Sequence, residues 1–263
     1  MENKIDNPNL VKEQYKNSSN LDARINLHSF NINKIDWHVW CFEKMNIPEG
    51  SKVLELGCGN GLLWTKNKQV IKKNLDITLS DLSEGMLKGA KENINNPNIK
   101  YQIIDVQDIP YEDECFDVVI ARHMLYHVPD IDKALSEIKR VLKPNGKFYV
   151  STNGSENMKE LRDLVNGYNK DTKYNPQKVF ADKFGIENGT EILKRYFNNV
   201  KLEKFDGQIV VDKAEPVVGY VTSGMNTRKG TFDGFYDYVK AEIDKAGAIK
   251  INTRSGMFMA SNS

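Results

Sequence analysis

The chain has 263 residues, of which 40% are hydrophobic, and its 37 Lys and Arg residues nearly balance 36 Asp and Glu residues. This composition is typical of a globular protein and excludes a disordered, collagen-like or coiled-coil chain. A net charge of +1 gives no basic face of the kind that binds nucleic acid.

The sequence shows neither a recognisable targeting signal nor a metal-binding spacing of Cys and His residues. The first residues, Met1–Val11, are polar and do not resemble a secretory signal, and no apolar run approaches the length of about 20 residues that spans a membrane. Cys41, Cys58 and Cys115 lie far apart, without zinc-ligand spacing. We therefore expect buried thiols, no metal and a cytoplasmic protein.

The first fifty residues predict helices, over Leu21–His28 and from a cap at Asp36 to Met45. From Lys52, short apolar runs alternate with amphipathic segments, which predicts an α/β fold with a mainly parallel sheet and helices on both faces. The five expected strands are Val53–Leu56, Asp76–Leu79, Lys100–Ile104, Phe116–Ala121 and Lys147–Ser151. The expected helices between them are Leu62–Val70, Ser83–Asn93 and Ile131–Leu142.

After Thr152 this rhythm changes. The remaining helices are expected at Glu156–Tyr168, Glu191–Phe197, Glu215–Gly224 and Phe232–Ala246, with a polar stretch over Asn169–Gln177. The remaining strands are expected at Val200–Val211 and at Ile249–Ser261, the latter interrupted at Arg254–Gly256. These two would close a sheet of about seven strands as an antiparallel pair. The expected organisation is an N-terminal helical cap at 1–46 and a main domain at 47–263, with a helical insertion at about 213–247.

The sharpest local signal is a glycine-rich turn, in which the apolar run Val53–Leu56 leads into Gly57, Gly59 and Gly61. Glycines between a strand and a helix let a ligand approach the backbone and the free N–H groups of the helix. A dinucleotide site would need a small residue where Leu62 stands, and Glu55 would lie close to its pyrophosphate. No Gly-Lys-Ser/Thr follows, which excludes a P-loop. Glu55 instead favours a cationic ligand.

This turn, Glu55-Leu56-Gly57-Cys58-Gly59-Asn60-Gly61, resembles motif I (E/D-x-G-x-G-x-G) of the class I S-adenosylmethionine-dependent methyltransferases. The resemblance implies a Rossmann-like fold and S-adenosyl-L-methionine as the cofactor. It also implies that the loop wraps the methionine end of the cofactor, through Glu55, Gly57, Cys58, Gly59 and Gly61.

Later landmarks fall where that family has them, so the resemblance covers residues 52–153 well and 195–263 loosely. It implies that Asp81 accepts both ribose hydroxyls and that Met86, shortly after Leu82, packs on the adenine. It further implies that Asp105 and its neighbour Val106 hold the adenine edge.

The methyl acceptor is expected beyond the end of the fourth strand, because ligands of open α/β sheets bind at the carboxyl ends of the strands. Arg122 ends that strand and is grouped with the cofactor residues. His123 and His127 are the candidate proton acceptors. The alternatives are a pocket wall for His123 and a satisfied core imidazole for His127.

The N-terminal segment holds two candidates for the cofactor carboxylate, Tyr15 and Arg24, and an Arg on a solvated helix face is the competing interpretation. Trp37 and Trp40 lie on one helix face and favour core packing over a cage for a cationic substrate. The aromatic-rich insertion predicts either a lid over a small acceptor or a homodimer contact.

The resulting hypothesis is an S-adenosylmethionine-dependent methyltransferase that acts on a small molecule at O or N, with no nucleic-acid or membrane partner. No Asn/Asp-Pro-Pro-Tyr run occurs to indicate nucleic-acid amines or protein amides as acceptors, and carbon or sulfur acceptors stay open. Two alternatives remain, a cofactor-binding regulatory protein without transferase activity and a nicotinamide-dependent oxidoreductase, which Glu55 and Leu62 disfavour.

Overall fold

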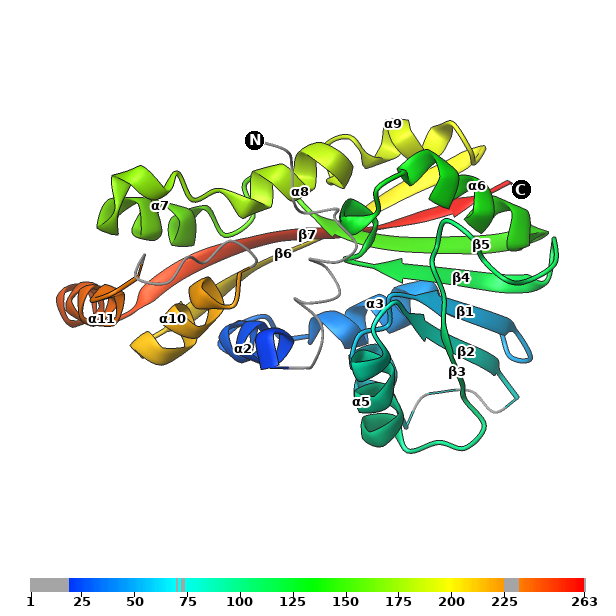
Figure 1. Cartoon of the computed structure of the whole chain (residues 1–263), viewed down its shortest axis with the longest axis horizontal. Coiled ribbons are helices and arrows are strands. Elements are labelled where there is room, and N and C mark those ends of the chain that lie inside the picture. The colour runs from blue at the N-terminus through cyan, green and yellow to red at the C-terminus, as the bar shows by residue number, and fades with distance from the viewer. Residues whose placement is uncertain (1–18, 70, 72–73, 225–231, 263) are drawn as a thin grey trace.

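The computed structural model describes residues 19–69, 71, 74–224 and 232–262. In this part of the chain the strands form one seven-stranded sheet in the order β3-β2-β1-β4-β5-β7-β6 (Figure 1). The strands are β1 (Lys52–Leu56), β2 (Asp76–Asp81), β3 (Lys100–Ile103), β4 (Phe116–Arg122), β5 (Leu142–Asn153), β6 (Asn199–Val211) and β7 (Ile249–Ser261). The first five are parallel to one another, and β7 is antiparallel to both β5 and β6. The predicted fold class is confirmed.

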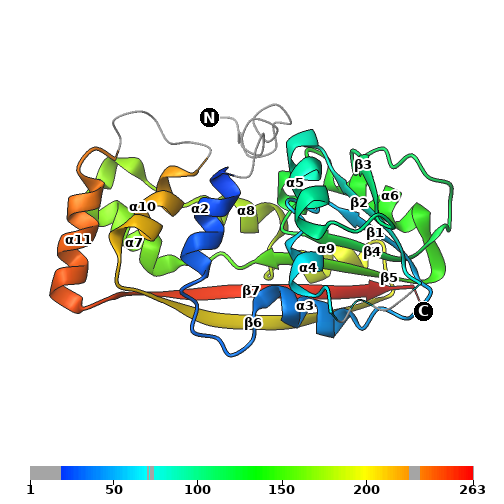
Figure 2. The same ribbon diagram turned by 90° about the horizontal axis from the view of Figure 1, so that it is seen from below.

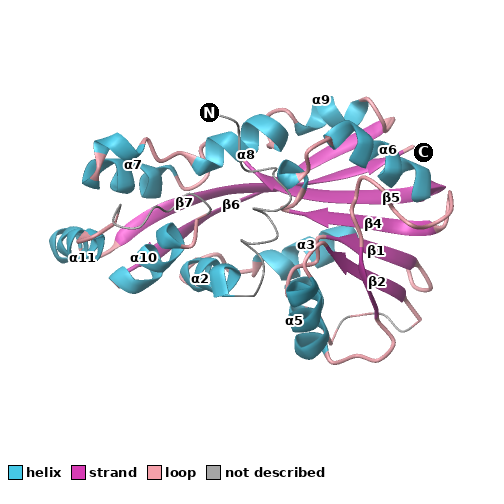
Figure 3. Ribbon diagram, viewed as in Figure 1, coloured by secondary structure: helices cyan, strands magenta, loops and turns pink. Residues whose placement is uncertain are grey.

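Helices cover both faces of this sheet (Figure 3). One face carries α3 (Trp37–Met45), α4 (Leu62–Lys66) and α5 (Glu84–Ile94). The other carries α6 (Ile131–Val141), α8 (Pro176–Phe184) and α9 (Gly189–Lys194). Each face has its own apolar core, because successive strand residues point to opposite sides: Val118 and Ile120 of β4 join the core under α3–α5, and Val119 and Ala121 join the core under α6.

The long strands β6 and β7 continue beyond the parallel strands as a two-stranded ribbon (Figure 2). On it lie α2 (Ser19–His28), α7 (Lys159–Tyr168), α10 (Ala214–Thr222) and α11 (Phe235–Ala246), which we call the helical lobe. A third apolar core holds the helical lobe together, and in it Leu27, Val217 and Phe235 pack on Ile209 and Ile251 of the ribbon.

The described part of the expected cap, residues 19–46, divides between two places in the structure. Helix α2 packs against α10 in the helical lobe, whereas α3 packs with α4 on the sheet. Asp36 caps α3 as predicted, because its carboxylate accepts the N–H groups of His38 and Val39 at 2.8 and 3.3 Å.

Three elements differ from the sequence predictions. Strand β7 is continuous through the predicted interruption at Arg254–Gly256. Gly256 is used there for close approach, since a Cβ would lie 2.8 Å from a methyl of Leu202 and 3.1 Å from the Glu203 carbonyl oxygen. Strand β5 begins at Leu142 rather than Lys147, and α8 was not predicted.

Two short 3₁₀ helices complete the described chain, η2 (Leu125–His127) and η3 (Lys170–Thr172). Among the described residues, every helix is too short or too polar to cross a lipid bilayer.

Candidate active site

The glycine loop follows β1 at the edge of the sheet where all the parallel strands end. Gly57, Gly59 and Gly61 have φ angles of 68°, 56° and 79°, which L side chains rarely adopt. The loop is fastened to β2, because the Cys58 N–H donates to the Ser80 carbonyl at 2.8 Å. The sequence-predicted loop residues are therefore assembled on one rigid turn.

The glycines differ in what surrounds them. A Cβ on Gly61 would lie 2.7 Å from Ile94 Cδ1, so this glycine lets the loop pack on α5. A Cβ on Gly59 would meet, among the described residues, only Leu21 of α2 at 3.6 Å. Among the described residues, a side chain at Gly59 would thus make one ordinary van der Waals contact and no clash, so packing within the described part of the chain does not account for this glycine.

Asp81 lies at the end of β2 and joins the loop to the next helix. Its carboxylate accepts the Gly59 N–H at 3.0 Å and the Ser83 N–H at 2.9 Å. Burial raises the pKa of the carboxyl group, and the backbone N–H groups oppose that rise. Two carboxylate oxygens have about four lone-pair positions, so Asp81 keeps capacity for ribose hydroxyls.

The residues expected around the adenine follow β2 and β3, which are neighbouring strands. Leu82 is half-buried and Met86 is buried in the first turn of α5, where Ser83 caps the helix by accepting the Met86 N–H. Val106 is buried, while Asp105 is exposed and accepts the N–H groups of Gln107. The assignment of these residues to the adenine stays a prediction.

Behind the loop lies a buried ion pair that sequence patterns did not reveal. Glu55 is fully buried, and its carboxylate accepts the Arg122 Nε–H at 3.1 Å and the Trp64 indole N–H at 2.6 Å. Arg122 is 8% exposed at its side chain, and its Nη1 lies 2.9 Å from His38 Nδ1 of α3. Glu55 and Arg122, both predicted as cofactor ligands, therefore bind each other on the α3 face of the sheet.

His38 is the neutral member of this network. Burial, followed by the charge of Arg122, holds the pKa of its imidazole well below the usual value of 6.5. Since a guanidinium can only donate, His38 Nδ1 accepts from Arg122 and the ring proton is on Nε2. His38 and Trp64 are the residues that sequence analysis missed here, and no local motif marks them, because they are 84 and 9 residues from their partners.

His123 follows β4 with a left-handed φ of 51°. Its ring centroid lies 5.5 Å from that of Trp37, and its backbone N–H donates to the Ser151 carbonyl. Burial, then the charges of Arg122 and His28, lower the pKa of His123 to about 3. The imidazole is therefore neutral at pH 7 and is a weak base.

His127 ends η2 among aromatic rings. The centroids of Tyr126 and Phe180 lie 4.7 and 5.3 Å from that of His127, so α8 contributes a wall beside it. Trp37 and Trp40 are stacked at 5.3 Å and both contact Phe205 of β6, which is packing rather than a cage.

Of the two expected carboxylate ligands on the N-terminal segment, Tyr15 lies outside the described residues. Arg24 projects from α2 toward the end of α10, where it donates to the hydroxyl and carbonyl oxygens of Ser223 at 3.4 and 3.3 Å. The structure thus directs Arg24 into the helical lobe.

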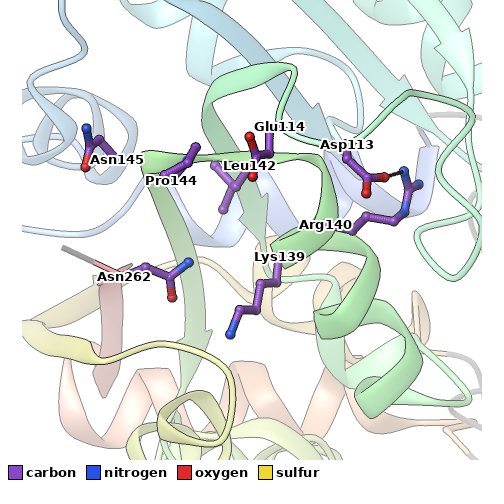
Figure 4. A pocket seen from close by; sticks show the side chains of 8 residues that line it. All are labelled: Asp113, Glu114, Lys139, Arg140, Leu142, Pro144, Asn145 and Asn262. Carbon is purple, nitrogen blue, oxygen red and sulfur yellow. Dashed lines mark hydrogen bonds and ion pairs between the residues drawn. The ribbon is translucent and has the colours of Figure 1, made fainter.

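A surface recess of about 530 Å³ lies at the opposite end of the sheet (Figure 4). Its lining includes Lys139 and Leu142, close to the start of β5, and Asp113, which pairs with Arg140 at 2.9 Å. Because the glycine loop follows the carboxyl end of β1, which is parallel to β4 and β5, this recess is separate from the candidate active site.

A sheet in this order, with a glycine loop after its first strand and an acid at the end of its second, defines a Rossmann-like cofactor domain. Residues 54–150 match the family described as "Methyltransferase domain". The ubiquinone/menaquinone biosynthesis C-methyltransferase UbiE of Idiomarina loihiensis is 29% identical over 147 residues, which are 54% of this chain and 58% of that protein. The chain thus spans little more than half the length of this relative.

Solved structures extend the likeness of fold. A protein from Bacillus halodurans C-125 is similar with a TM-score of 0.59 at 18% identity, over 85% of this chain and 97% of that one. The 4+2 cyclase SpnF has the same TM-score at 16% identity and covers 95% of both chains. Residues 54–150 are thus a methyltransferase domain, and these likenesses support a class I S-adenosylmethionine-dependent methyltransferase with S-adenosyl-L-methionine as its cofactor.

Proposed function

We propose that this protein transfers a methyl group from S-adenosylmethionine to a small-molecule acceptor, at oxygen or nitrogen. The observation that carries the proposal is the bond between the Gly59 N–H and the Asp81 carboxylate, 3.0 Å long. It joins the motif I loop to the acid to which the family resemblance gives the ribose, and this supports our assignment of both to one cofactor site.

In this proposal Gly57, Cys58, Gly59 and Gly61 surround the methionine end of the cofactor, and Asp81 accepts the ribose hydroxyls. The adenine contacts are assigned to Leu82, Met86, Asp105 and Val106. Glu55 and Arg122 support the loop from behind through their ion pair, and they remain candidates for contact with the methionine group. When bound, the cofactor supplies an activated methyl group on a sulfonium.

The protein's part in the reaction is alignment and exclusion of water, because the cofactor carries its own leaving group. His123 and His127 follow β4 and line the acceptor side. A neutral His123 with a pKa of about 3 accepts a proton poorly at pH 7. That weakness favours an acceptor atom that carries no proton to be removed at pH 7, such as an ionised hydroxyl or a weakly basic amine.

The acceptor atom needs its own assay. The relative UbiE is named as a C-methyltransferase, and SpnF is named as a cyclase despite its similar fold. We would incubate the purified chain with cofactor labelled at the methyl carbon and the small-molecule fraction of a cell extract. NMR of the labelled methyl carbon in the product distinguishes attachment to O, N, C or S.

The expected result is a labelled small molecule and S-adenosylhomocysteine in equal amounts, with neither formed by Asp81→Ala. S-adenosylhomocysteine binding without any transfer would support the regulatory alternative. A melting temperature raised by a nicotinamide cofactor but not by S-adenosylhomocysteine would support the oxidoreductase.

A further inference from the structure

Strand β6 is the last strand of the sheet, so one of its two edges has no neighbouring strand in the described part of the chain (Figure 2). The Ile32 N–H donates to the Gln208 carbonyl at 2.9 Å. The Val210 N–H donates to the Phe30 carbonyl at 3.1 Å. Gln208 and Val210 therefore direct their backbone groups to this outer edge. Because β6 pairs with β7 without a register shift, the other even-numbered residues of β6 do the same.

The described chain covers one end of this outer edge and leaves the other open. Residues 30–33 cover it as far as Asp206, whose carbonyl accepts from the Asn33 side-chain amide at 3.0 Å. From residue 199 to residue 205, no described residue hydrogen-bonds to the outward backbone groups. Every residue of this open stretch is at least partly exposed, although Met257 and Phe258 on the neighbouring strand β7 are fully buried. Outward N–H and C=O groups of this kind are a template for another strand.

The charges of the open stretch are complementary to those of a second copy. Two antiparallel copies of residues 199–205 that use the whole stretch pair about its middle residue, Leu202. Lys201 of each copy then lies opposite Glu203 of the other, on the same face of the sheet, and the twofold axis repeats this pair. The two neighbouring registers, centred on Lys201 or on Glu203, would place like charges opposite each other. The sequence of the strand thus selects the register about Leu202.

These two side chains are accessible to a second copy. The Lys201 side chain is 71% exposed, and the Glu203 side chain is 23% exposed. Within one copy Glu203 already binds Lys201 and, at 3.3 Å, Lys44 of α3. A carboxylate has about four lone-pair positions, so Glu203 has capacity for a further donor.

A surface recess of about 680 Å³ begins where the open stretch ends. Its lining includes Phe205 of β6 together with Ile32 and Ile35. Ile32 and Ile35 are 62% and 44% exposed, and they are two of the four exposed large hydrophobic residues in the described part of the chain. Pairing about Leu202 brings the residues that precede Asn199 in the second copy to this recess. Association would therefore also remove apolar surface from water.

We propose that this protein forms a homodimer through residues 199–205 of β6, in which two copies pair antiparallel about Leu202 and the two sheets become continuous. This interface differs from the aromatic-rich insertion at about 213–247, for which the sequence left a homodimer contact open. Three strands separate β6 from β1 and its glycine loop. The interface therefore does not use the candidate active site.

The test is sedimentation velocity of the full chain across the micromolar concentration range, in which the wild-type protein should be a dimer. Lys201→Glu and Glu203→Lys each place two like-charge pairs in the interface, so each should weaken self-association by about a hundredfold or more. An equimolar mixture of these two variants should form dimers again, because every charge at the axis then lies opposite a charge of the other sign.

Lys250→Glu is the matched control, because it makes the same change of charge at an exposed residue of β7, outside the open stretch. It should leave the dimer as strong as in the wild type. Thermal unfolding of each variant verifies that it is folded. A monomeric wild type would overturn the proposal, and so would a dimer that Lys201→Glu leaves intact. A mixture of Lys201→Glu and Glu203→Lys that stays monomeric would also overturn it.

Discussion

Arg122 is a buried cation beneath α3, and its two partners, together with a residue that binds one of them, stabilise its charge. The Glu55 carboxylate neutralises it, the Trp64 indole fixes the second Glu55 oxygen, and neutral His38 accepts from the guanidinium. Such a pair adds little net stability over an apolar substitute, but loss of one partner leaves the other charge buried alone. The network therefore specifies where α3 and α4 sit behind the loop.

Glu55→Gln should destabilise the protein by about 3–5 kcal/mol, because Arg122 would remain charged without a counter-ion. The measurement is the free energy of unfolding in urea. Arg122→Met alone should cost a similar amount by leaving the carboxylate unpaired. The double variant should be more stable than the sum of the two losses implies, and strictly additive losses would show that the pair is not coupled.

His123 should make stability depend on pH in the acid range. Its pKa is about 3 in the folded protein, against the ordinary histidine value of 6.5 that holds in the unfolded chain. Between these values the unfolded chain binds a proton that the folded chain does not. Stability is therefore complete above pH 6.5 and declines as the pH falls toward 3. His123→Asn keeps a residue that tolerates the left-handed φ and removes the titration.

The difference in unfolding free energy between wild type and His123→Asn is the quantity to follow, because it cancels the other titrating groups. It should change as the pH falls from about 6.5 to about 4.5 and be constant above about 7. A difference that stays constant over the whole range would show that the imidazole titrates alike in both states.

Among the elements, the glycine loop contains one glycine that the packing of the fold requires and another that we expect ligand binding to require. Gly59 and Gly61 both have positive φ, but only Gly61 is pressed against another helix, at Ile94 and Ala90 of α5. The two positions share a backbone cost of about 1–2 kcal/mol for any Cβ and differ in what that Cβ meets.

Gly61→Ala should therefore destabilise the protein more than Gly59→Ala, because its methyl group also overlaps Ile94. Gly59→Ala should instead reduce S-adenosylhomocysteine affinity, since its methyl group enters the space the cofactor approaches. Thermal unfolding measures the stability of the two variants, and calorimetric titration measures their affinity for S-adenosylhomocysteine. Each variant is the control for the other. If Gly59→Ala and Gly61→Ala lost the same affinity and the same stability, the assignment of Gly59 to ligand binding and of Gly61 to packing would be wrong.

How far sequence patterns predict each element depends on the range of the interactions that form it. The strands β1 to β4 and the glycine loop are set by apolar runs and local backbone needs, and they were predicted within a few residues. The partners of Glu55 were not, because Arg122 and His38 come from distant segments that meet only in the folded sheet. The β7 interruption was wrong for the same reason, since Gly256 serves contact with β6 rather than a turn.

At the scale of the whole molecule, the described residues form three apolar cores, two in the sheet domain and one in the helical lobe. The two cores on the sheet faces lie under the cofactor loop, whereas the third holds α2, α10 and α11 on the ribbon. Elements that share few contacts with the main cores open at lower free energy. We therefore expect the helical lobe to loosen separately from the sheet.

Phe235→Ala and Phe148→Ala form a matched test, since both rings are fully buried, the first in the helical lobe and the second in the sheet. Either truncation should cost about 3–5 kcal/mol. Hydrogen exchange of Phe235→Ala should accelerate in α2, α10 and α11, with β1 and β4 still protected and S-adenosylhomocysteine still bound. Phe148→Ala should expose the parallel strands as well. Equal acceleration across both regions in Phe235→Ala would mean that the molecule opens as one unit.

The pairing of Val211 with Ile249 at the far end of the ribbon has a consequence for how this protein can diversify. The segment that contains α10 and α11 leaves and re-enters the sheet at two neighbouring residues, so changes in its length add little loop-closure entropy. The segment between Val211 and Ile249 can therefore be lengthened, shortened or replaced with little effect on the sheet. Changes in α10 and α11 can then accumulate while β1 to β4 and the cofactor loop keep their sequence.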